Sequence, residues 1–332
     1  MRLDRIDMLE SMRLDRITVP AAAPVPHILF TGSTTKETSM RIFVTGASGW
    51  IGSAVVPELI GAGHQVLGLA RSDASAQALA GMGAEALRGD LNDTGVLRAG
   101  TLDSDGVIHL AFVVPSVSEA ATRTDAMAIE TFAASLAGSG KPLVISGATL
   151  VTPGRPATER DELIATGPIA ARITNMQAAL AAAARGVRSC LVMLPRSVHG
   201  QGERHGFIPQ LVAAARTKGV SGYIGNGTSR WPAVHVKDAA SLYRLAVEQA
   251  PAGAVLNAVG DEGVPVREIA EAIGRNLNLP ARSLPAEEFG GTLVPLLSRD
   301  MPASSTITRE LLGWQPTHPG LIEDIEQGHY FT

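Results

Sequence analysis

Residues 41–53 read Arg41-Ile-Phe-Val-Thr-Gly-Ala-Ser-Gly-Trp-Ile-Gly-Ser53, and this stretch decides the fold. A short apolar segment, Ile42–Val44, leads directly into three glycines at intervals of three residues, and a helical pattern of apolar residues follows. A strand, a tight glycine turn and a helix in this order make a cradle for the pyrophosphate of a dinucleotide, because the amide groups at the helix N-terminus point at the anion. The stretch therefore predicts a dinucleotide-binding turn.

Each glycine of this turn has its own expected role. Gly46 lets the chain turn sharply, Gly49 lets the backbone approach a phosphate, and Gly52 lets the helix pack closely against the strand. Ser48 belongs to the same turn, and the chain has no G-x-S-x-G nucleophile elbow of a hydrolase. The cofactor contacts predicted in the turn are Gly46, Ser48, Gly49, Trp50, Ile51 and Gly52.

Strand-like and helix-like segments alternate from Arg41 onward. The strand-like segments are continuously apolar, as expected for strands that are buried on both faces of a parallel sheet. The expected fold class is α/β, with a doubly wound (Rossmann) parallel sheet and a smaller C-terminal substrate-binding region. The sequence predicts seven strands, at 42–44, 65–70, 84–87, 106–111, 142–146, 188–194 and 254–259.

The character of the chain changes near residues 40 and 195. Residues 1–39 contain a repeated Met-Arg-Leu-Asp-Arg-Ile, three prolines and a polar run, and we expect a disordered leader; an extra helix that docks on a partner is the alternative. Residues 40–195 are expected to form the dinucleotide-binding Rossmann core. Residues 196–332 contain more Gly, Pro and His, with helices at 238–249 and 267–278, and are expected to be mainly a substrate-binding region that does not fold independently.

The composition excludes several classes of function. With a net charge of −4 the chain lacks the positive charge typical of nucleic-acid-binding proteins, so no nucleic acid is expected as a partner. No run of about 18 apolar residues occurs, so no membrane span is expected. The single cysteine, Cys190, lies in an apolar run and indicates a core residue rather than a reactive thiol. The lack of a cysteine framework favours a reducing compartment, and we expect a cytoplasmic location.

Several further motifs follow the glycine turn in a fixed order. They are Gly89-Asp90-Leu91, Val107-Ile-His-Leu-Ala111, Leu194-Pro195 with Val198-His-Gly200, and Leu312-Gly-Trp-Gln-Pro316. With the TGxxGxxG form of 45–52, the ordered set resembles the extended short-chain dehydrogenase/reductase family, which includes NAD-dependent epimerases and dehydratases. The resemblance covers residues 40–330.

The resemblance implies further cofactor contacts beyond the glycine turn. The acidic turn after the third strand, Asp90 and Leu91, would hold the adenine. The end of the fourth strand would pass the nicotinamide ribose, and the turn after the sixth strand would lie beside the nicotinamide. The residues implied at these two places are Leu110, Ala111, Phe112, Pro195 and Val198.

The end of the second strand indicates which nicotinamide nucleotide is bound. Members of the family that prefer NAD have a carboxylate here, which bonds the ribose 2′-hydroxyl. This chain has Ala70, Arg71 and Ser72 instead. Arg71 offers a positive charge and forked donors that suit a 2′-phosphate, and Ser72 could add a hydroxyl donor. We therefore expect NADP(H) rather than NAD(H); the alternative is that Arg71 is a solvated residue at a strand end.

The catalytic pair implied by the resemblance is a Tyr followed four residues later by a Lys, which lowers the phenol pKa and holds the ribose. None of the three tyrosines has a lysine four residues on. Placed against the family pattern, Arg172 stands at or next to the Lys position, and Pro168 or Ile169 stands at the Tyr position. Arg172 could hold the nicotinamide ribose or stabilise an oxyanion, but it is a poor proton donor.

A hydroxyl group that polarises a substrate carbonyl is expected after the fifth strand. The usual position falls near Ala148 or Thr149, and Thr149 is the preferred candidate. Ser146 is a weaker candidate and is also counted among the cofactor contacts. Both hydroxyls could instead make ordinary hydrogen bonds at a strand end. Trp231 could line the substrate pocket or pack in the core.

Histidines are the remaining candidates for proton transfer. His199 and His205 lie in the loop after the sixth strand, where either could reach a substrate cleft with a pKa near neutrality. His109 and His235 are expected to be structural, and Asp238 is the expected N-cap of a late helix. No metal site is expected, because no pair of histidines has acidic or cysteine neighbours at ligand spacing.

These observations favour an NADP-dependent oxidoreductase with a non-standard active site that acts on a carbonyl or alcohol of a small molecule. Thr149, Arg172 and His199 are the predicted catalytic residues. A catalytically silent NADP-binding sensor or scaffold is the first alternative, because the Tyr and Lys are missing. A sugar-nucleotide-type epimerase or dehydratase that uses its cofactor transiently is the second. By analogy with the family, the chain could form a homodimer.

Overall fold

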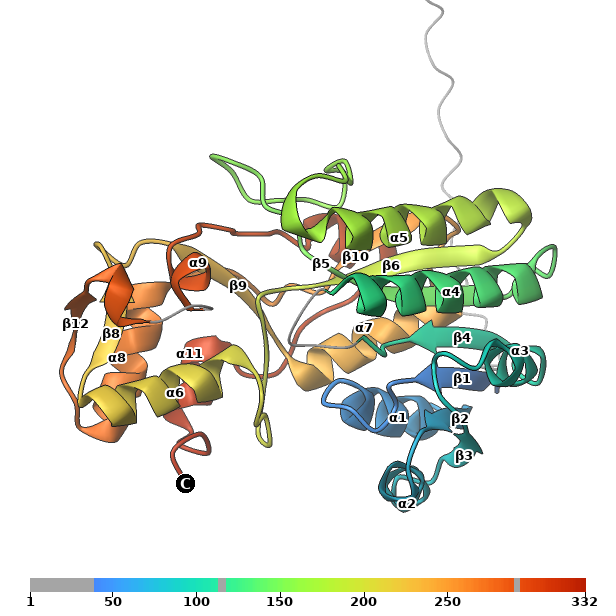
Figure 1. Ribbon diagram of the computed structural model, residues 1–332, viewed down its shortest axis with the longest axis horizontal. Coiled ribbons are helices and arrows are strands. Elements are labelled where there is room, and N and C mark those ends of the chain that lie inside the picture. The colour runs from blue at the N-terminus through green and yellow to red at the C-terminus, as the bar shows by residue number, and fades with distance from the viewer. Residues whose placement is uncertain (1–38, 113–117, 290–292) are drawn as a thin grey trace, which may run out of the picture. The chain divides into compact units, whose positions relative to one another are not determined.

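Seven parallel strands form the central sheet of the computed structural model, which describes residues 39–112, 118–289 and 293–332 (Figure 1). The strand order is β10-β6-β5-β4-β1-β2-β3. All seven strands predicted from the sequence are present, and the α/β fold class with a doubly wound sheet is confirmed. Residues 1–38 of the predicted leader lie outside the described residues. The strands are β1 (Arg41–Thr45), β2 (Gln65–Ala70), β3 (Glu85–Arg88), β4 (Gly106–His109), β5 (Pro142–Ala148), β6 (Arg188–Leu194) and β10 (Ala254–Asn257).

Two layers of helices cover the faces of this sheet (Figure 1). Helices α1 and α7 contact each other on one face, while α3, α4 and α5 form a contiguous layer on the other. Helix α2 contacts β2 and β3 at the edge of the sheet. The helices are α1 (Gly52–Gly61), α2 (Asp73–Gly81), α3 (Thr94–Leu102), α4 (Glu119–Leu136), α5 (Ala170–Ala181) and α7 (Val236–Gln249).

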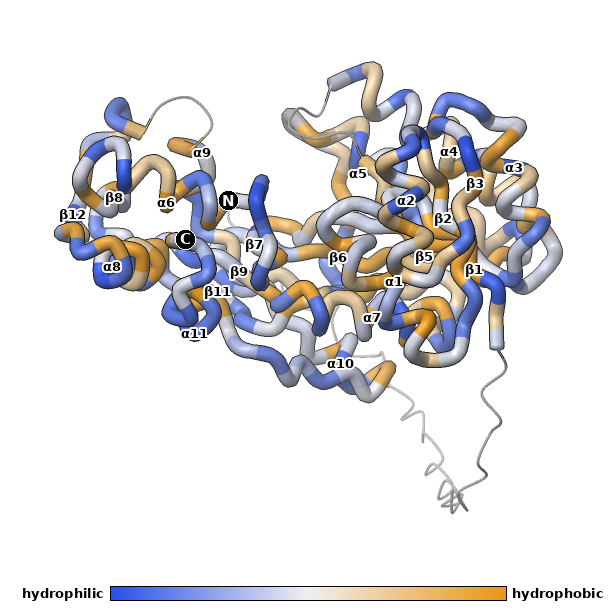
Figure 2. Tube along the Cα trace, turned by 90° about the horizontal axis from the view of Figure 1, so that it is seen from below, coloured by the Kyte–Doolittle hydropathy of each residue, from blue (hydrophilic) through white to orange (hydrophobic). Residues whose placement is uncertain are grey.

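The middle strand β1 shows why these segments become strands. Ile42, Phe43 and Val44 are completely buried, and their side chains alternate between the two hydrophobic clusters that flank the sheet. Hydrophobic positions recur along the strands of the large sheet (Figure 2). Each such side chain stabilises the fold by about 1.5–3 kcal/mol relative to exposure. A continuous apolar run is therefore the signature of a strand with a helix layer on both sides.

A smaller group of elements in the C-terminal half surrounds a separate hydrophobic cluster. Trp231 is fully buried in it, so this residue packs in the core rather than lining a pocket. One three-stranded sheet has the order β11-β9-β7, and β8 and β12 form a parallel pair. The elements are β7 (Ser197–His199), α6 (Phe207–Lys218), β8 (Ser221–Ile224), β9 (Arg230–His235), β11 (Asp261–Pro265), α8 (Val266–Leu277), β12 (Ala281–Leu284), α9 (Leu293–Leu297) and α11 (Leu321–Glu326). Helix α10 (Thr306–Leu312) instead contacts β10 and α7, and its Leu312 belongs to a cluster that flanks the central sheet.

The predicted division of the chain at residue 195 is too simple. Helix α7 packs against α1 and the central sheet, and β10 pairs with β6 in that sheet, although both follow residue 196. The chain therefore crosses between the two halves more than once. The expectation that the C-terminal region does not fold independently stays a prediction.

Two predictions from composition can be compared with the structure. Among the residues that the structure describes, no helix combines the length and the apolar character that crossing a bilayer requires. Cys190 is buried in β6, as predicted for a core residue. Burial raises the pKa of its thiol to about 12, so the thiolate form is disfavoured.

Candidate cofactor and active site

The glycine turn lies at the position where the strand order reverses, between β1 and its neighbours β2 and β4. In open α/β sheets ligands bind in the crevice at this switch point. Gly46 has φ of +69°, and a Cβ added to it would lie 2.7 Å from the backbone nitrogen of Ala111. A Cβ added to Gly52 would lie 2.3 Å from the carbonyl oxygen of Gly46. The first and third glycines are therefore required by backbone conformation and close packing.

The N-terminus of α1 is left without a side-chain cap, and its first turn contains no acidic residue. The next three helices are capped by Ser72, Asp93 and Ser118, respectively. A helix start without a cap leaves backbone N–H donors and the positive end of the helix dipole available to an anion. This contrast fits a pyrophosphate at the glycine turn.

Trp50 connects the glycine turn to the C-terminal half of the molecule. Its indole Nε1 donates to the carbonyl oxygen of Val198, which lies in β7, at 2.7 Å. A Cβ added to Gly202 would lie 3.7 Å from the Trp50 ring. Trp50 and Val198 were predicted as cofactor contacts, and the structure shows that they contact each other.

A buried chain of polar groups runs behind the glycine turn from β1 to α4. The hydroxyl oxygen of Thr45 lies 2.6 Å from Nδ1 of His109, and Nε2 of His109 lies 3.3 Å from Oδ1 of Asp125. Because an ionised Asp125 can only accept, His109 donates to it through Nε2. Burial by itself raises the pKa of Asp125, but His109, Arg172 and Asn175 together outweigh it and hold the pKa below its usual value. His109 is structural, as predicted.

Arg172 extends this chain to the ends of β4 and β5. Its Nη1 donates to Asp125 at 3.4 Å and its Nη2 donates to the carbonyl oxygen of Ser146 at 2.9 Å. The guanidinium carbon lies 3.6 Å from the ring centroid of Phe112. Burial lowers the pKa of Arg172, and the charge of Asp125 partly offsets that effect. The Arg172 cation is thus held in one place at the ligand edge of the sheet.

Neither residue at the expected Tyr position is a tyrosine, although the phenol of Tyr243 on α7 lies near enough to Arg172 to interact with its charge. Ile169, one of the two residues at the expected Tyr position, is an exposed apolar residue. Pro168, the other, is in the short 3-10 turn Gly167–Ile169 that precedes α5. The predicted absence of the usual proton donor from these two positions therefore follows from the residue types themselves.

The two candidate hydroxyl groups, Ser146 near the end of β5 and Thr149 just after it, have different surroundings. Ser146 faces the α7 side: its Oγ donates to the carbonyl oxygen of His109 at 3.0 Å and lies 2.7 Å from the hydroxyl of Tyr243. These partners make the Ser146 hydroxyl a poor candidate to polarise a substrate carbonyl, because strand alternation turns it into the core. Its role as a cofactor contact stays a prediction. Thr149 is buried, and its Oγ1 has no hydrogen-bond partner among the described residues. Its backbone N–H donates to Leu194 at the end of β6.

The residues predicted at the adenine end lie where the sequence placed them. Arg71 is exposed directly after β2, and no ion pair of the described residues includes it. Asp73, the nearest carboxylate in sequence, pairs with Arg88 at 2.9 Å. Ser72 is also exposed, and its Oγ accepts from the N–H of Ser75 as the cap of α2. Asp90 accepts hydrogen bonds from Asn92, and Leu91 packs against the core.

The remaining predicted cofactor contacts lie at the ends of β4 and β6. The N–H of Leu110 donates to the carbonyl oxygen of Thr45 at 3.1 Å, and the N–H of Ala111 lies 3.4 Å from the Thr45 hydroxyl. Pro195 is buried directly after β6. These contacts fix the position of the backbone beside the glycine turn.

His199 does not have the surroundings predicted for a catalytic group. The ring is completely buried, Nδ1 lies 3.0 Å from Oδ2 of Asp324, and the ring packs edge-on against His235. The prediction of a histidine facing a substrate cleft is wrong here, because residues near the C-terminus fold over it. His205, the other candidate, is exposed on the loop before α6.

Three possible metal ligands come together in the fold although the sequence spacing did not suggest it. Ligand atoms of His235, Asp238 and His318 all lie within 4.8 Å of one another. Asp238 accepts from the N–H groups of Thr317 and His318 and from Nδ1 of His318, while Nδ1 of His235 accepts from the N–H of Lys237. His235 is thus the N-cap of α7, a role that the sequence assigned to Asp238. These hydrogen bonds attach the segment after α10 to the first turn of α7. They explain why the three side chains lie together without a metal ligand role.

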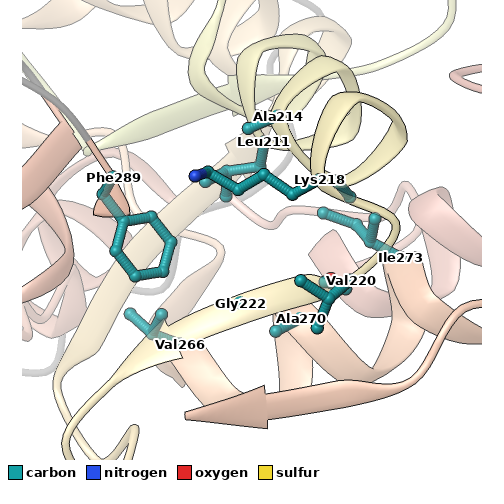
Figure 3. Close-up of a pocket in the computed structure, with 11 residues that line it drawn as sticks. Leu211, Ala214, Lys218, Val220, Gly222, Val266, Ala270, Ile273 and Phe289 are labelled. Atoms are coloured by element: carbon teal, nitrogen blue, oxygen red, sulfur yellow. The ribbon is translucent and has the colours of Figure 1, made fainter. Parts of the chain in front are cut away.

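A small apolar pocket lies between α6, β8 and α8 (Figure 3). Leu211, Val266 and Phe289 are among its lining residues, and Lys218 lies at its side. Its volume is about 10 Å³, which is room for one water molecule. None of the predicted site residues lines it, so the candidate site remains at the switch point of the large sheet.

Sequence reasoning missed three members of the polar chain. Thr45, Asp125 and Asn175 belong to it, since the Nδ2 of Asn175 donates to Asp125 at 2.7 Å. Thr45 carried a signal, because it directly precedes the first glycine. Asp125 and Asn175 are 50 residues apart in sequence and lie on different helices. The one available signal was a polar residue on the apolar face of each helix.

Comparison with known proteins agrees with this geometry. Residues 42–258 match the model of the NAD dependent epimerase/dehydratase family. An uncharacterised protein of Saccharomyces cerevisiae is 44% identical over 297 residues, which cover 87% of this chain and 99% of the relative. A UDP-glucose 4-epimerase of Streptomyces lividans is 29% identical over 331 residues, covering 88% of this chain and 96% of that protein.

A solved structure shows the same fold over nearly the same length. The Thermus thermophilus UDP-glucose 4-epimerase in complex with NAD superimposes with a TM-score of 0.68 at 19% identity, covering 88% of this chain and 99% of the other. The seven-stranded sheet, the glycine turn at its switch point and the family match over most of the sequence lead to one conclusion. This chain belongs to the NAD dependent epimerase/dehydratase family.

Proposed function

We propose that this protein is an NADP-dependent oxidoreductase that transfers hydride to or from a carbonyl or alcohol group of a small molecule. The observation that carries the proposal is the fixed Arg172 cation, bound to Asp125 and to the Ser146 carbonyl at the ligand edge of the sheet. Against the family pattern, Arg172 would stand at or next to the position of the lysine that holds the ribose.

The residues present fit a nicotinamide dinucleotide. The uncapped start of α1 and the close-packed glycines would hold the pyrophosphate, and Arg172 would hold the ribose on the nicotinamide side. The cofactor supplies the hydride when it is bound. Thr149 would donate a hydrogen bond to the substrate oxygen, because its buried hydroxyl has no partner in the described part of the chain. With His199 enclosed in the C-terminal half, the proton would come from water.

Arg71 supports the preference for NADP. It is exposed at the end of β2 and free of ion pairs among the described residues, while Asp73 is engaged by Arg88. A guanidinium at this place can bind a 2′-phosphate with two parallel hydrogen bonds. A carboxylate that would select NAD is absent from the strand end itself.

The Arg71→Ala variant tests the choice of cofactor. Loss of a charged hydrogen-bonded contact of about 1.5–3 kcal/mol would weaken NADPH binding by roughly tenfold to a hundredfold. NADH binding should be almost unchanged, as should both affinities in Arg98→Ala, which removes another exposed arginine of the same half. Fluorescence titration of the reduced nucleotides measures both. Equal losses for NADPH and NADH in Arg71→Ala would contradict the preference.

The Thr149→Val variant tests the chemistry. A panel of carbonyl compounds with NADPH is followed by the absorbance of the reduced nicotinamide. We expect the active substrate to be turned over far more slowly by the variant, while its stability stays within about 1 kcal/mol, because the lost hydroxyl had no partner to lose. Tight NADPH binding by the unmodified protein with no turnover of any compound would favour the silent sensor instead.

An epimerase or dehydratase is the second candidate, because the Streptomyces lividans relative is a UDP-glucose 4-epimerase. Such a reaction gives no net change in the nicotinamide. Incubation with UDP-glucose and chromatography of the sugar nucleotide separate the two candidates. Appearance of a second sugar nucleotide without consumption of NADPH would replace the oxidoreductase proposal.

A further inference from the structure

A short segment that begins at Val198 in β7 connects the glycine turn with the C-terminal end of the chain. Toward the glycine turn, the carbonyl oxygen of Val198 accepts from the indole of Trp50 at 2.7 Å, and a Cβ added to Gly202 would lie 3.7 Å from the Trp50 ring. Toward the C-terminus, the N–H of Gly200 donates to the hydroxyl of Tyr330 at 3.0 Å. The same few residues therefore contact both Trp50 and Tyr330.

Glu203 attaches the far end of this segment, residues 198–203, which we call the bridging loop. Its Oε2 lies 2.8 Å from the hydroxyl oxygen of Tyr330, and its N–H donates to the carbonyl oxygen of Gly200 at 3.2 Å. A Cβ added to Gly206 would overlap the Glu203 carboxylate, so the glycine leaves room for that carboxylate to fold back. The chain ends beside α6 and α11 (Figure 1), and Glu203 ties the bridging loop to this end.

The hydroxyl of Tyr330 has two carboxylate neighbours and one hydrogen. Besides Glu203, it contacts Oδ2 of Asp324 at 3.1 Å. Ionised carboxylates only accept hydrogen bonds, and a phenol donates one. All three groups are bonded at once when Glu203 is protonated, because Glu203 then donates to Tyr330 and Tyr330 donates to Asp324. When both carboxylates are ionised, one of these two contacts is lost.

Glu203 is the carboxylate that is free to leave. Asp324 is buried and lies 3.0 Å from Nδ1 of His199 and 3.6 Å from Nε2 of His329. Glu203 is only partly buried, and the residues on either side of it are exposed. Burial raises the pKa of Glu203 to about 7; the hydrogen bond with Tyr330 opposes this effect, and the charge of Asp324 adds to it. The contact between Glu203 and Tyr330 is therefore present in acid and lost as the pH rises through neutrality.

We infer that the C-terminal segment is a pH-sensitive latch on the cofactor site, in which Tyr330 and protonated Glu203 hold the bridging loop against Trp50 and loss of the proton releases it. The inference rests on the proposed function, because it assigns a regulation to the nucleotide site of that reaction. Trp50 lies between Gly49 and Gly52, so its side chain helps to fix the backbone that would receive the pyrophosphate. Nucleotide affinity should fall as the pH rises, by about fivefold, which is the low end of ordinary coupling between two sites.

The indole N–H of Trp50 reports the latch without any nucleotide. The chain has three tryptophans, so protein labelled with nitrogen-15 tryptophan gives three indole signals in NMR spectra, and Trp50→Phe assigns the relevant one. We expect this signal to move with a midpoint near pH 7. It should stay fixed in Glu203→Gln, because glutamine donates to Tyr330 and does not titrate. Glu268→Gln, at an exposed carboxylate of the same half, should behave as the unmodified protein does. The same pH dependence in Glu203→Gln and the unmodified protein would overturn the inference.

Calorimetric titration with NADP⁺ at about pH 6 and about pH 8.5 tests the consequence for the site. Glu203→Gln should bind about fivefold more tightly than the unmodified protein at the higher pH, a gain that loss of a merely structural side chain would not give. Gly206→Ala displaces the Glu203 carboxylate without removing it and should bind weakly at both pH values. The other groups that titrate near the cluster or on the nucleotide are common to all these proteins, so ratios between proteins isolate Glu203. They are His199, His235, His329 and the 2′-phosphate of NADP⁺.

The outcomes separate this inference from the proposed function. NADP⁺ binding with the same pH dependence in the unmodified protein, Glu203→Gln and Glu268→Gln would overturn the latch and leave the oxidoreductase standing. No binding of either nicotinamide nucleotide at any pH would refute the proposed function and the regulation of its site together. If Gly206→Ala does not fold, Tyr330→Phe takes its place, because it removes the hydroxyl shared by Gly200 and Glu203. Weak NADP⁺ binding by that variant at both pH values is expected, and affinity equal to that of the unmodified protein at about pH 6 would overturn the inference.

Discussion

Glu203 provides the most sharply defined prediction of stability. The residue is partly buried in the loop before α6, and its Oε2 lies 2.8 Å from the hydroxyl of Tyr330 near the C-terminus. The same hydroxyl lies 3.1 Å from Oδ2 of Asp324 and accepts from the N–H of Gly200. A phenol has one hydrogen and cannot donate to two carboxylates at once. Protonated Glu203 resolves the conflict, because it donates to Tyr330 while Tyr330 donates to Asp324.

The pKa of Glu203 agrees with that arrangement. Burial raises it from the ordinary 4.5 to about 7, and the charge of Asp324 contributes in the same direction, against the opposing hydrogen bond from Tyr330. The stabilisation of the protonated form is fully present below pH 4.5 and is lost as the pH rises through about 7. At about 1.4 kcal/mol per pH unit, and discounted for partial exposure, the loss is about 2–3 kcal/mol.

The Glu203→Gln variant isolates this contribution. Glutamine keeps a donor toward Tyr330 but cannot titrate. His235 complicates the profile of the unmodified protein, because burial and His199 lower its pKa to about 4, so its contribution is lost as the pH falls below 6.5. Since His235 is present in both proteins, the difference between their unfolding free energies reports Glu203 alone.

Urea unfolding followed by circular dichroism measures that difference at several pH values between about 4.5 and 8. Relative to the variant, the unmodified protein should lose about 2–3 kcal/mol between the low end of this range and pH 8, and the difference should level off as the pH passes above the pKa of about 7. Glu310→Gln, at an exposed carboxylate, serves as the control. A difference that does not change with pH, or that equals the control's, would refute the shared-hydrogen argument.

Two further variants test the site itself. In Gly52→Ala, the added Cβ would lie 2.3 Å from the carbonyl oxygen of Gly46, so the turn must shift. We expect urea unfolding to show a loss of about 1–3 kcal/mol in stability. We expect fluorescence titration to show at least a tenfold loss in NADPH affinity. Normal NADPH binding would show that the turn is not the pyrophosphate site. Asp125→Ala leaves the buried Arg172 without its carboxylate and should cost about 3 kcal/mol in urea unfolding; a loss below about 1 kcal/mol would mean that the pair contributes little.

The sequence was most informative where the cause of structure is local. The seven strands could be predicted because continuous apolar runs are what a sheet with helices on both faces requires, and each run carries that signal alone. The glycine turn was equally clear, since Gly46 and Gly52 meet backbone constraints that only glycine satisfies. The position of Arg172 at the ligand edge followed from the family pattern on the same helix.

Contacts between distant segments decided what the sequence could not. Ser146 and Thr149 are three residues apart, yet Ser146 in β5 faces Tyr243 in the core, while the hydroxyl of Thr149 just after β5 has no hydrogen-bond partner within the described ranges. Packing of distant segments sets this difference. The sequence places His199 in a loop after the sixth strand, but in the fold its ring is buried against Asp324, which lies 125 residues later in the chain. Burial and charge pairing depend on which segments of the chain come into contact. Contacts between distant segments form only in the complete fold, so the local sequence does not reveal them.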